Sequence, residues 1–466
     1  MFFFQDDIGI LIQLASIPFP QILFEQQAGR FLPIFRLFSL LEFKLFGLEF
    51  TYYVLVAFLI HLLNCFLLWK LSFQIVRNKY FSWLAVSLFA VNLTHVESLL
   101  WWSAHGELLA MTFLATAFFL WYRFVTTDSL RALFLSIPLL LFSGFTYGVG
   151  VGLGIIFAAI TYIYKSIAKN NQKLGIFLYS GVGIACAFGG IVVAKGTQSQ
   201  FVDPILYVAK YVLFVVAGVS RGVVGRLFFP GFDPRHFEII PSLISFLPFL
   251  LFLALYVSMF RNIRTKGKRI VLLLLVMVVY PYLWAGILRA QFGLKQALAE
   301  RYAYVSLFFF SILFSYLLSK LTHEGFIRSK WVVTTFVASI LVLQSFVFHL
   351  KSVDFEVRPQ KTKKYMEDLT EVVHASDTVI NLPLPSYINQ PYHIKDLVPV
   401  ITVENKYRFI DPKHFVCDNT TKEFLRNSKI YEFYLTQSSD WKVRKEFSKR
   451  ALYECHRDIQ QSNKRI

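Results

Sequence analysis

The residues best suited to chemistry lie in one stretch, NLTHVESLLWWSAHGELLA, between two long apolar runs. Four ionisable residues stand in it: His95, Glu97, His105 and Glu107. Ionisable groups at the mouth of an apolar helix bundle cost free energy unless they bind something there. Two tryptophans between them are typical of a membrane–water interface. We therefore predict that the four residues belong to a substrate-binding loop at one membrane face.

The spacing of these residues leaves their role open. His95 and Glu97 are two positions apart, so they do not share a helix face, and His105 and Glu107 repeat that offset. A His/Glu cluster can bind a divalent cation. No HExxH or comparable spacing is present, so a divalent cation stays open and no metal ligand is assigned. Polar anchoring at the interface is the alternative explanation for each residue.

An acidic pair, Asp6 and Asp7, is the candidate catalytic group. One carboxylate can take a proton from an incoming hydroxyl or amide nucleophile, while the other orients the nucleophile or binds a cation. The alternative is a pair of solvated charges that keeps the N-terminal segment out of the lipid.

Two arginines are candidate substrate-binding residues. Arg301 begins the apolar run ERYAYVSLFFF, where its guanidinium can bind a phosphate through two parallel hydrogen bonds. Arg30 lies in the N-terminal segment, residues 1–50, whose charges and prolines predict a loop with interfacial helices. For Arg301 the alternative is an anchoring ion pair with Glu300.

These residues need a membrane scaffold. The chain of 466 residues is 56% hydrophobic and only 16% charged, which excludes an ordinary water-soluble globular protein. Its apolar runs are long enough to cross about 30 Å of hydrocarbon. Much of the net charge of +18 lies in short loops between these runs, where Lys and Arg orient membrane helices. The charge therefore does not indicate nucleic acid as a partner, and no motif for a nucleotide cofactor is present.

The fold class predicted is an all-α polytopic membrane protein with about ten transmembrane helices, arranged so that every basic cluster lies on one face. The spans are predicted at 51–71, 80–98, 106–124, 131–147, 149–164, 174–194, 240–260, 269–288, 302–320 and 331–349. Residues 195–238 are predicted to stay outside as a re-entrant or interface-lying helix pair. If 205–219 crossed the membrane fully, the basic cluster that follows the span 240–260 would lie on the non-cytoplasmic face, whereas positive residues prefer the cytoplasmic face.

Two domains are predicted: a transmembrane domain over residues 1–350 and a small α/β or α+β domain over residues 351–466. Short β-rich runs at 378–384 and 397–403 precede a polar helical end at 440–462. The second domain is predicted on the non-cytoplasmic face, together with the loops 1–50, 92–105, 195–238 and 289–301.

Four stretches, in this order, resemble polytopic glycosyltransferases of the GT-C superfamily. They read FQDDIGIL, GRFLPIFRLFSLLEFKLFGLEFTYYVLVAFLIHLLNCFLLWKL, NLTHVESLLWWSAHGELLA and ERYAYVSL. The closest likeness is to the branch with protein O-mannosyltransferase-like and TMTC-like membrane proteins. The resemblance covers residues 1–125 and 289–320, and the remainder matches only in layout.

The resemblance implies an inverting transfer of a sugar from a polyprenyl-phosphate donor to a protein or glycan acceptor. The reaction would take place on the non-cytoplasmic face of a bacterial inner membrane or of the endoplasmic reticulum. It makes Asp7 the general base, with Asp6 in support. It places His95 and Glu97 near the acceptor or the donor phosphate, and it places Arg301 on the donor phosphate.

The chain departs from the family pattern at two places. Relatives have a membrane span ahead of the acidic pair, whereas Met1 lies five residues before Asp6, and we expect a truncated or misassigned start. Relatives also carry an arginine shortly after the second-loop HxE, where this chain reads Ser103-Ala104-His105. The imidazole of His105 replaces that arginine only when it is protonated.

Two other functions remain as alternatives. A polymerase or ligase of lipid-linked glycans would use outer loops and cationic side chains without an acidic base in the first loop. A transporter or flippase would bury charged residues at mid-span. The ionisable residues of this chain gather at the span ends, so transport is the least favoured of the three.

Overall fold

The computed structural model describes residues 3, 6–27, 30–147, 152–163, 168–193, 204–228, 230, 249–250, 253–254, 257, 265–290, 297–323, 329–375, 378–380, 408–410, 432–435 and 441–444. The chain divides into two compact units. The helical unit comprises Leu23–Asp354, and the terminal unit comprises Met1–Ile22 together with Phe355–Ile466.

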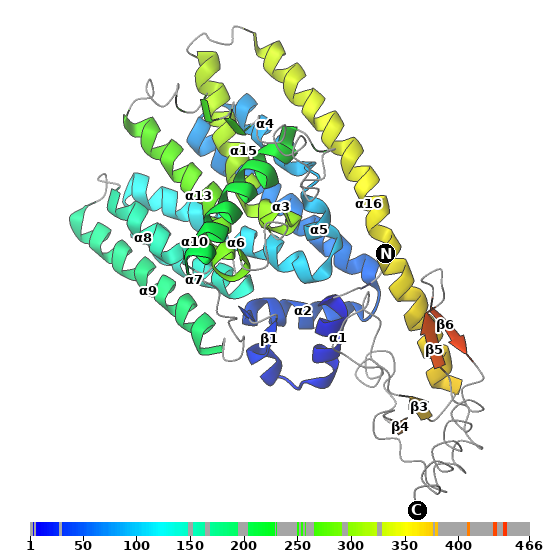
Figure 1. Cartoon of the computed structure of the whole chain (residues 1–466). Helices are drawn as coiled ribbons and strands as arrows, with labels where there is room; N and C mark the ends of the chain where they lie inside the picture. The colour runs from blue at the N-terminus through cyan, green and yellow to red at the C-terminus, as the bar shows by residue number, and fades with distance from the viewer. Residues whose placement is uncertain are drawn as a thin grey trace, which may run out of the picture. The chain divides into compact units, whose positions relative to one another are not determined.

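The described elements are mostly helices (Figure 1). They are α1 (Asp6–Ser16), η1 (Gln21–Phe24), α2 (Pro33–Phe46), α3 (Phe50–Val76), α4 (Lys79–Ala90), α5 (His95–Leu100), η2 (Trp102–Ala104), α6 (His105–Thr127), α7 (Leu130–Thr146), α8 (Leu153–Ile163), α9 (Lys169–Val193), α10 (Pro204–Ala217), η4 (Gly218–Gly225), α11 (Arg226–Phe228), α13 (Thr265–Arg289), α15 (Glu300–His323) and α16 (Lys330–Ala375). The strands are β1 (Gln26–Gln27), β2 (Arg30–Phe31), β3 (Thr378–Ile380), β4 (Arg408–Ile410), β5 (Glu432–Leu435) and β6 (Trp441–Arg444).

Six helical segments among the described residues are long and apolar enough to cross a membrane. They are Phe50–Val76, Trp102–Thr127, Ile205–Phe228, Gly267–Ile287, Glu300–His323 and Trp331–Val353. Large apolar side chains point outward from them, such as Leu55, Phe58 and Leu62 of α3, as is expected where a helix meets lipid. The chain is therefore a multi-pass integral membrane protein, as predicted, while the count of ten spans stays a prediction.

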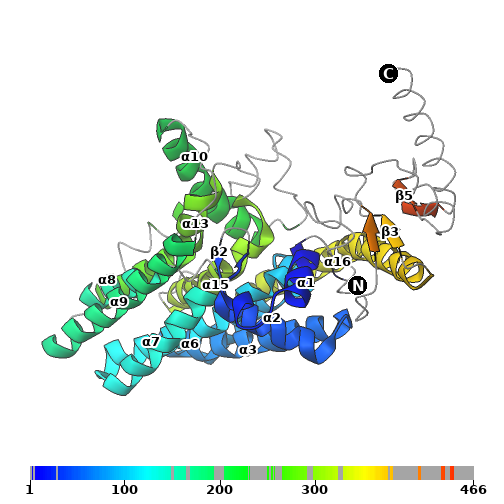
Figure 2. The same ribbon diagram turned by 90° about the horizontal axis from the view of Figure 1, so that it is seen from below.

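Helix α15 forms the centre of the helical unit. It packs against α13, η4, α5, α4 and α3, and 89% of its apolar window is buried. Helix α16 is peripheral by comparison, because only 22% of its apolar window is buried (Figures 1 and 2). The residues at the first turn of α15 are therefore held by several surrounding elements.

Helix α2 turns its polar side chains inward and its leucines outward. Arg36, Ser39 and Glu42 are buried, whereas Leu37, Leu41 and Leu45 are each about half exposed or more. An amphipathic helix of this kind suits a membrane interface, with its apolar face in lipid. Gly47 ends the helix with a φ of 56°, a conformation that glycine adopts at little cost.

The span predicted at 80–98 is two helices, α4 and α5, separated by a turn. The side-chain oxygen of Asn92 accepts hydrogen bonds from the backbone N–H (3.0 Å) and the hydroxyl (2.9 Å) of Thr94. Such an Asn turn competes with the helical hydrogen-bond ladder. The prediction of one continuous span here is therefore wrong.

Residues 204–228 also differ from the prediction. Helix α10, the π-helical turn η4 and α11 follow one another without a break, and Ile205–Phe228 has the length and apolar character of a membrane-crossing helix. The prediction had kept this segment outside as part of a re-entrant or interface-lying pair. The predicted span 240–260 lies mostly outside the described residues.

The described residues of the terminal unit include two pairs of short strands. Strands β3 and β4 pair in parallel, and β5 and β6 pair antiparallel, with Leu435 opposite Trp441. The predicted helical end at 440–462 is therefore wrong for Trp441–Arg444, where Trp and Val alternate with Lys and Arg as in a strand. The β-rich run predicted at 397–403 lies outside the described residues. The α/β or α+β class of this part stays a prediction.

Helices α8 and α9 lie side by side in both views (Figures 1 and 2). Gly154 of α8 faces the backbone of α9 so closely that an added Cβ would overlap the main-chain N of Gly183 and the main-chain O of Tyr179. Small residues allow this kind of close backbone approach between membrane helices.

We predict that Gly154→Ala destabilises the protein by about 2 kcal/mol, because backbone atoms must move to admit the methyl group. Gly181→Ala on α9 is the matched control, since a Cβ there meets nothing within 4 Å. It should be neutral or slightly stabilising. Thermal denaturation in detergent measures both variants. Equal midpoints for the two would contradict the packing described for α8 and α9.

Candidate functional site

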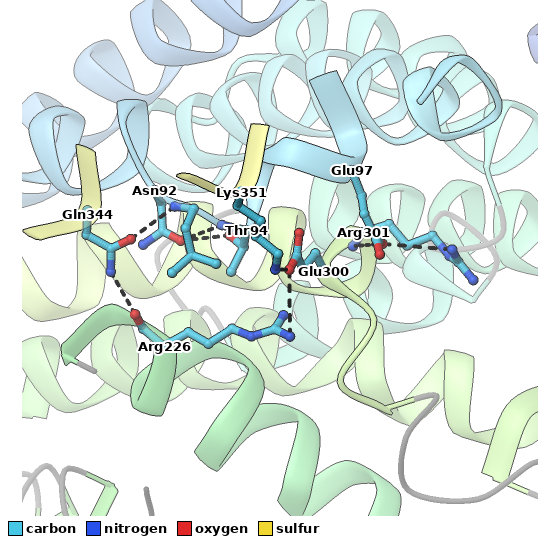
Figure 3. A network of polar contacts seen from close by, with 9 residues as sticks. Asn92, Thr94, Glu97, Arg226, Glu300, Arg301, Gln344 and Lys351 are labelled. Carbon is cyan, nitrogen blue, oxygen red and sulfur yellow. Dashed lines mark hydrogen bonds and ion pairs between the residues drawn. The ribbon is translucent and has the colours of Figure 1, made fainter. Parts of the chain in front are cut away.

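The structure brings Glu97 of α5 and Arg301 of α15 together at one end of the helical unit (Figure 3). The guanidinium Nη1 lies 3.8 Å from Glu97 Oε2, and the backbone N–H of Arg301 donates to the same oxygen at 3.3 Å. Both side chains are 21% exposed. Of the residues predicted for the site, these two make a direct polar contact across 204 positions of sequence.

Two aromatic rings hold the guanidinium of Arg301 in place. Its central carbon lies 4.9 Å from the ring centre of Trp101 and 5.3 Å from that of Tyr302. Contacts of this kind between a cation and an aromatic face are favourable, most of all with tryptophan. Trp101 therefore positions an arginine here, in addition to any preference for the membrane interface.

Glu300 has partners of its own, so the predicted alternative of a Glu300–Arg301 pair is wrong. Its buried carboxylate lies 3.8 Å from Arg226 Nη2 and forms a second ion pair with the ammonium of Lys351. Arg226 is 3% exposed and Glu300 4% at their side chains. The three charges join α11, α15 and α16 (Figure 3).

Gln344 of α16 contacts α11 and the turn before α5 through its amide. Its Nε2 donates to the backbone oxygens of Arg226 (2.7 Å) and Leu227 (2.9 Å). Its Oε1 accepts from the backbone N–H of Leu93 at 3.0 Å. These bonds satisfy backbone carbonyl groups of α11 and a backbone N–H of the turn before α5. Gln344 therefore holds α11 and this turn close to the ion pairs.

His95 lies in the interior rather than beside Glu97. Its ring packs 4.7 Å from those of Phe89 and Tyr304 and 4.9 Å from that of His61, and its Nε2 is hydrogen-bonded to the backbone oxygen of Phe89. His61 in turn is hydrogen-bonded to the Tyr304 hydroxyl at 2.8 Å. This geometry gives His95 a packing role between α4, α5 and α15.

His105 and Glu107 are also buried, at the start of α6. The Nε2 of His105 lies 3.3 Å from the backbone oxygen of Leu99, and Glu107 Oε2 accepts from the Ser98 hydroxyl at 3.3 Å. These bonds connect α5 to α6. Of the four ionisable residues predicted in this stretch, only Glu97 is partly exposed.

Asp6 and Asp7 form the first turn of α1, in the terminal unit. A helix N-terminus favours carboxylates. Asp7 is fully buried and Asp6 is exposed, so the alternative of solvated charges fits Asp6 alone. The side chain of Arg30 lies outside the described residues. The roles predicted for Asp7 as the base and for Arg30 in substrate binding stay predictions.

No metal ligand is assigned. Among the residues that the structure describes, no group of three or more His, Cys, Asp or Glu side chains is arranged to hold a metal ion. The divalent cation that the sequence left open stays open.

The sequence predicted no role for Gln344 or Lys351. It placed Arg226 in the segment 195–238, whose charged residues were expected either to bind a lipid head group or an acceptor or to form the polar side of an interfacial helix. Gln344 was detectable as an amide inside the apolar run 331–353, where a polar side chain is costly unless it has a buried partner. Glu42 of α2 was also missed. Its Oε2 accepts from the indole N–H of Trp102 at 2.6 Å.

Burial raises the pKa of the Glu42 carboxyl to about 8, although the hydrogen bond from Trp102 acts in the opposite direction. An unfolded chain loses this proton near pH 4.5. Between these two values the folded state binds the proton and the unfolded state does not. The contribution of Glu42 to the free energy of unfolding therefore falls as the pH rises from about 4.5 to about 8.

We predict that Glu42→Gln removes this pH dependence, which is on the order of a few kcal/mol in total, because the amide keeps the neutral shape without titrating. The check is the melting midpoint in detergent from pH 5 to pH 9, taken as the difference between wild type and variant. Glu49→Gln, at an exposed position before α3, is the control. A wild-type curve parallel to that of Glu42→Gln would rule out a neutral buried carboxyl.

The site is thus an end of an apolar helix bundle at which three cations, Arg226, Arg301 and Lys351, are in ion pairs with two carboxylates, Glu97 and Glu300. Its aromatic partners are Trp101, which follows α5, and Tyr302 of α15, and its amide partner is Gln344 of α16. No protein-family model and no curated protein matches this chain.

Proposed function

We propose that the chain is a membrane glycosyltransferase of the GT-C type, which moves a sugar from a polyprenyl-phosphate-linked donor to a protein or glycan acceptor at the non-cytoplasmic face. The observation that carries the proposal is the excess of positive charge at the site. Three cations face two carboxylates at the end of a bundle whose outer surface is apolar. A polyprenyl phosphate has matching parts, an apolar chain for the lipid and an anionic head for the cations.

The charges suit the leaving group of such a reaction. In an inverting transfer the acceptor oxygen or nitrogen bonds to the anomeric carbon while the bond from that carbon to the phosphate oxygen breaks. The phosphate leaves with the electron pair, and the acceptor proton passes to a base. A fixed guanidinium such as that of Arg301 stabilises the charge that develops on phosphate. In this proposal the base is Asp7, by resemblance, and Asp6 supports it.

The proposal also assigns sides to the membrane protein. The first 50 residues and the loops 92–105 and 289–301 lie on the non-cytoplasmic face, where the donor head group and the acceptor meet. The small C-terminal domain lies on the same side. Its bilayer is a bacterial inner membrane or the endoplasmic reticulum. The GT-C-like arrangement of about ten spans belongs to this proposal.

We predict that Asp7→Asn abolishes sugar transfer and that Arg301→Gln lowers it by about 100-fold or more, the usual scale for a lost charge-stabilising donor. The assay follows release of polyprenyl phosphate from radiolabelled polyprenyl-phosphate monosaccharides in membranes that contain the natural acceptor. Glu49→Gln is the control for a lost surface charge, and it should keep wild-type activity.

Expression and insertion must be equal among the three variants for the comparison to hold. Undiminished transfer by Asp7→Asn would remove that residue as the base, and undiminished transfer by Arg301→Gln would remove the phosphate assignment. If only a pyrophosphate-linked oligosaccharide acts as donor, the chain is a glycan polymerase or ligase instead.

A further inference from the structure

One oxygen of Glu97 is held in the way that an anion-binding site holds a phosphate oxygen. Glu97 Oε2 accepts a hydrogen bond from the backbone N–H of Arg301 at 3.3 Å and lies 3.8 Å from the guanidinium of the same residue. The N–H belongs to the first turn of α15, a helix of 24 residues. The first turn of a helix presents N–H groups without intrahelical partners and the positive end of the helix dipole.

The charge around this oxygen favours an anion even though Glu300 begins the same helix. The carboxylate of Glu300 is compensated by Arg226 and by Lys351. Glu107 also acts on Arg301, and Arg221 acts on Arg226, so that four cations and three carboxylates together leave one net positive charge. This becomes two if the Glu97 carboxylate moves away. An incoming phosphate therefore meets a more strongly positive site than the structure shows with Glu97 in place.

The ion pair between Glu97 and Arg301 is weak enough for another anion to replace Glu97. Both side chains are 21% exposed and their charged atoms are 3.8 Å apart, whereas the Glu300 side chain is 4% exposed. Partly exposed ion pairs contribute little stability, since each partner can be solvated instead. We expect the guanidinium of Arg301 to stay in position without Glu97, because the rings of Trp101 and Tyr302 contact it independently of the carboxylate.

We propose that Glu97 is a resident anion on Arg301, which the phosphate head group of a polyprenyl phosphate displaces on binding. The phosphate oxygen takes the place of Glu97 Oε2 beside the guanidinium and the first turn of α15, and the Glu97 carboxylate turns to solvent. The identity of the lipid rests on the proposed function. Glu97 is then a specificity-determining residue, because an anion that binds Arg301 only weakly cannot displace the Glu97 carboxylate.

The test measures binding and not transfer. Wild type, Glu97→Gln, Glu97→Asp and Arg301→Gln are titrated with a polyprenyl monophosphate in phosphatidylcholine nanodiscs, and separately with inorganic phosphate in neutral detergent. We expect Glu97→Gln to tighten binding by about threefold to tenfold, because the competing charge is gone. Glu97→Asp should stay near wild type, and Arg301→Gln should lose binding.

Glu49→Gln serves as the matched control, since it removes one carboxylate from an exposed position before α3 and should leave the affinity unchanged. Tightening with both probes supports displacement by phosphate in general, and tightening with the lipid alone supports recognition of the lipid-borne head group. An unchanged or weaker affinity of Glu97→Gln for both probes would overturn the proposal. Tighter phosphate binding without any sugar transfer would refute the proposed function and leave this inference standing.

Discussion

The site depends on the neutralisation of one buried carboxylate, that of Glu300. A charge of this kind in the interior is stable only if opposite charges accompany it. Arg226 and Lys351 do so, from α11 and α16. The first turn of α15 is thereby fixed to two other helices. The neighbouring Arg301 then points to a different part of the bundle end, where Glu97 and Trp101 receive it.

Much of the helical architecture could be predicted from hydropathy. The run 51–71 is α3, and the run 302–320 is α15, with each helix a few residues longer than the apolar segment. Lys70 lies within the predicted run, and its ammonium lies 4.7 Å over the ring of Phe66 and so does not interrupt the apolar surface. The break between α4 and α5 was not predicted, because it depends on the Asn92 side chain and on Gln344, which is distant in sequence.

Several residues of the candidate site were predicted, but the contacts between them were predicted only in part. Glu97 and Arg301 were both named, but Arg301 was given Glu300 as its alternative partner. Adjacent residues of a helix point about 100° apart and do not face each other, so that pairing was excluded by helix geometry. The histidines illustrate a second reason. Residue type alone does not separate an imidazole that meets a ligand from one that, like His95, packs among aromatic rings.

The proposed function requires the acidic pair of the first loop and Arg301 to lie at one membrane face, and cysteine labelling in sealed vesicles of known orientation tests this requirement most directly. Asp6→Cys reports on α1, and Glu97→Cys reports on the partly exposed position that contacts Arg301. Both are placed in a chain whose native cysteines are replaced by serine. A membrane-impermeant maleimide should modify both positions from the non-cytoplasmic side only. Modification of the two from opposite sides would contradict the account.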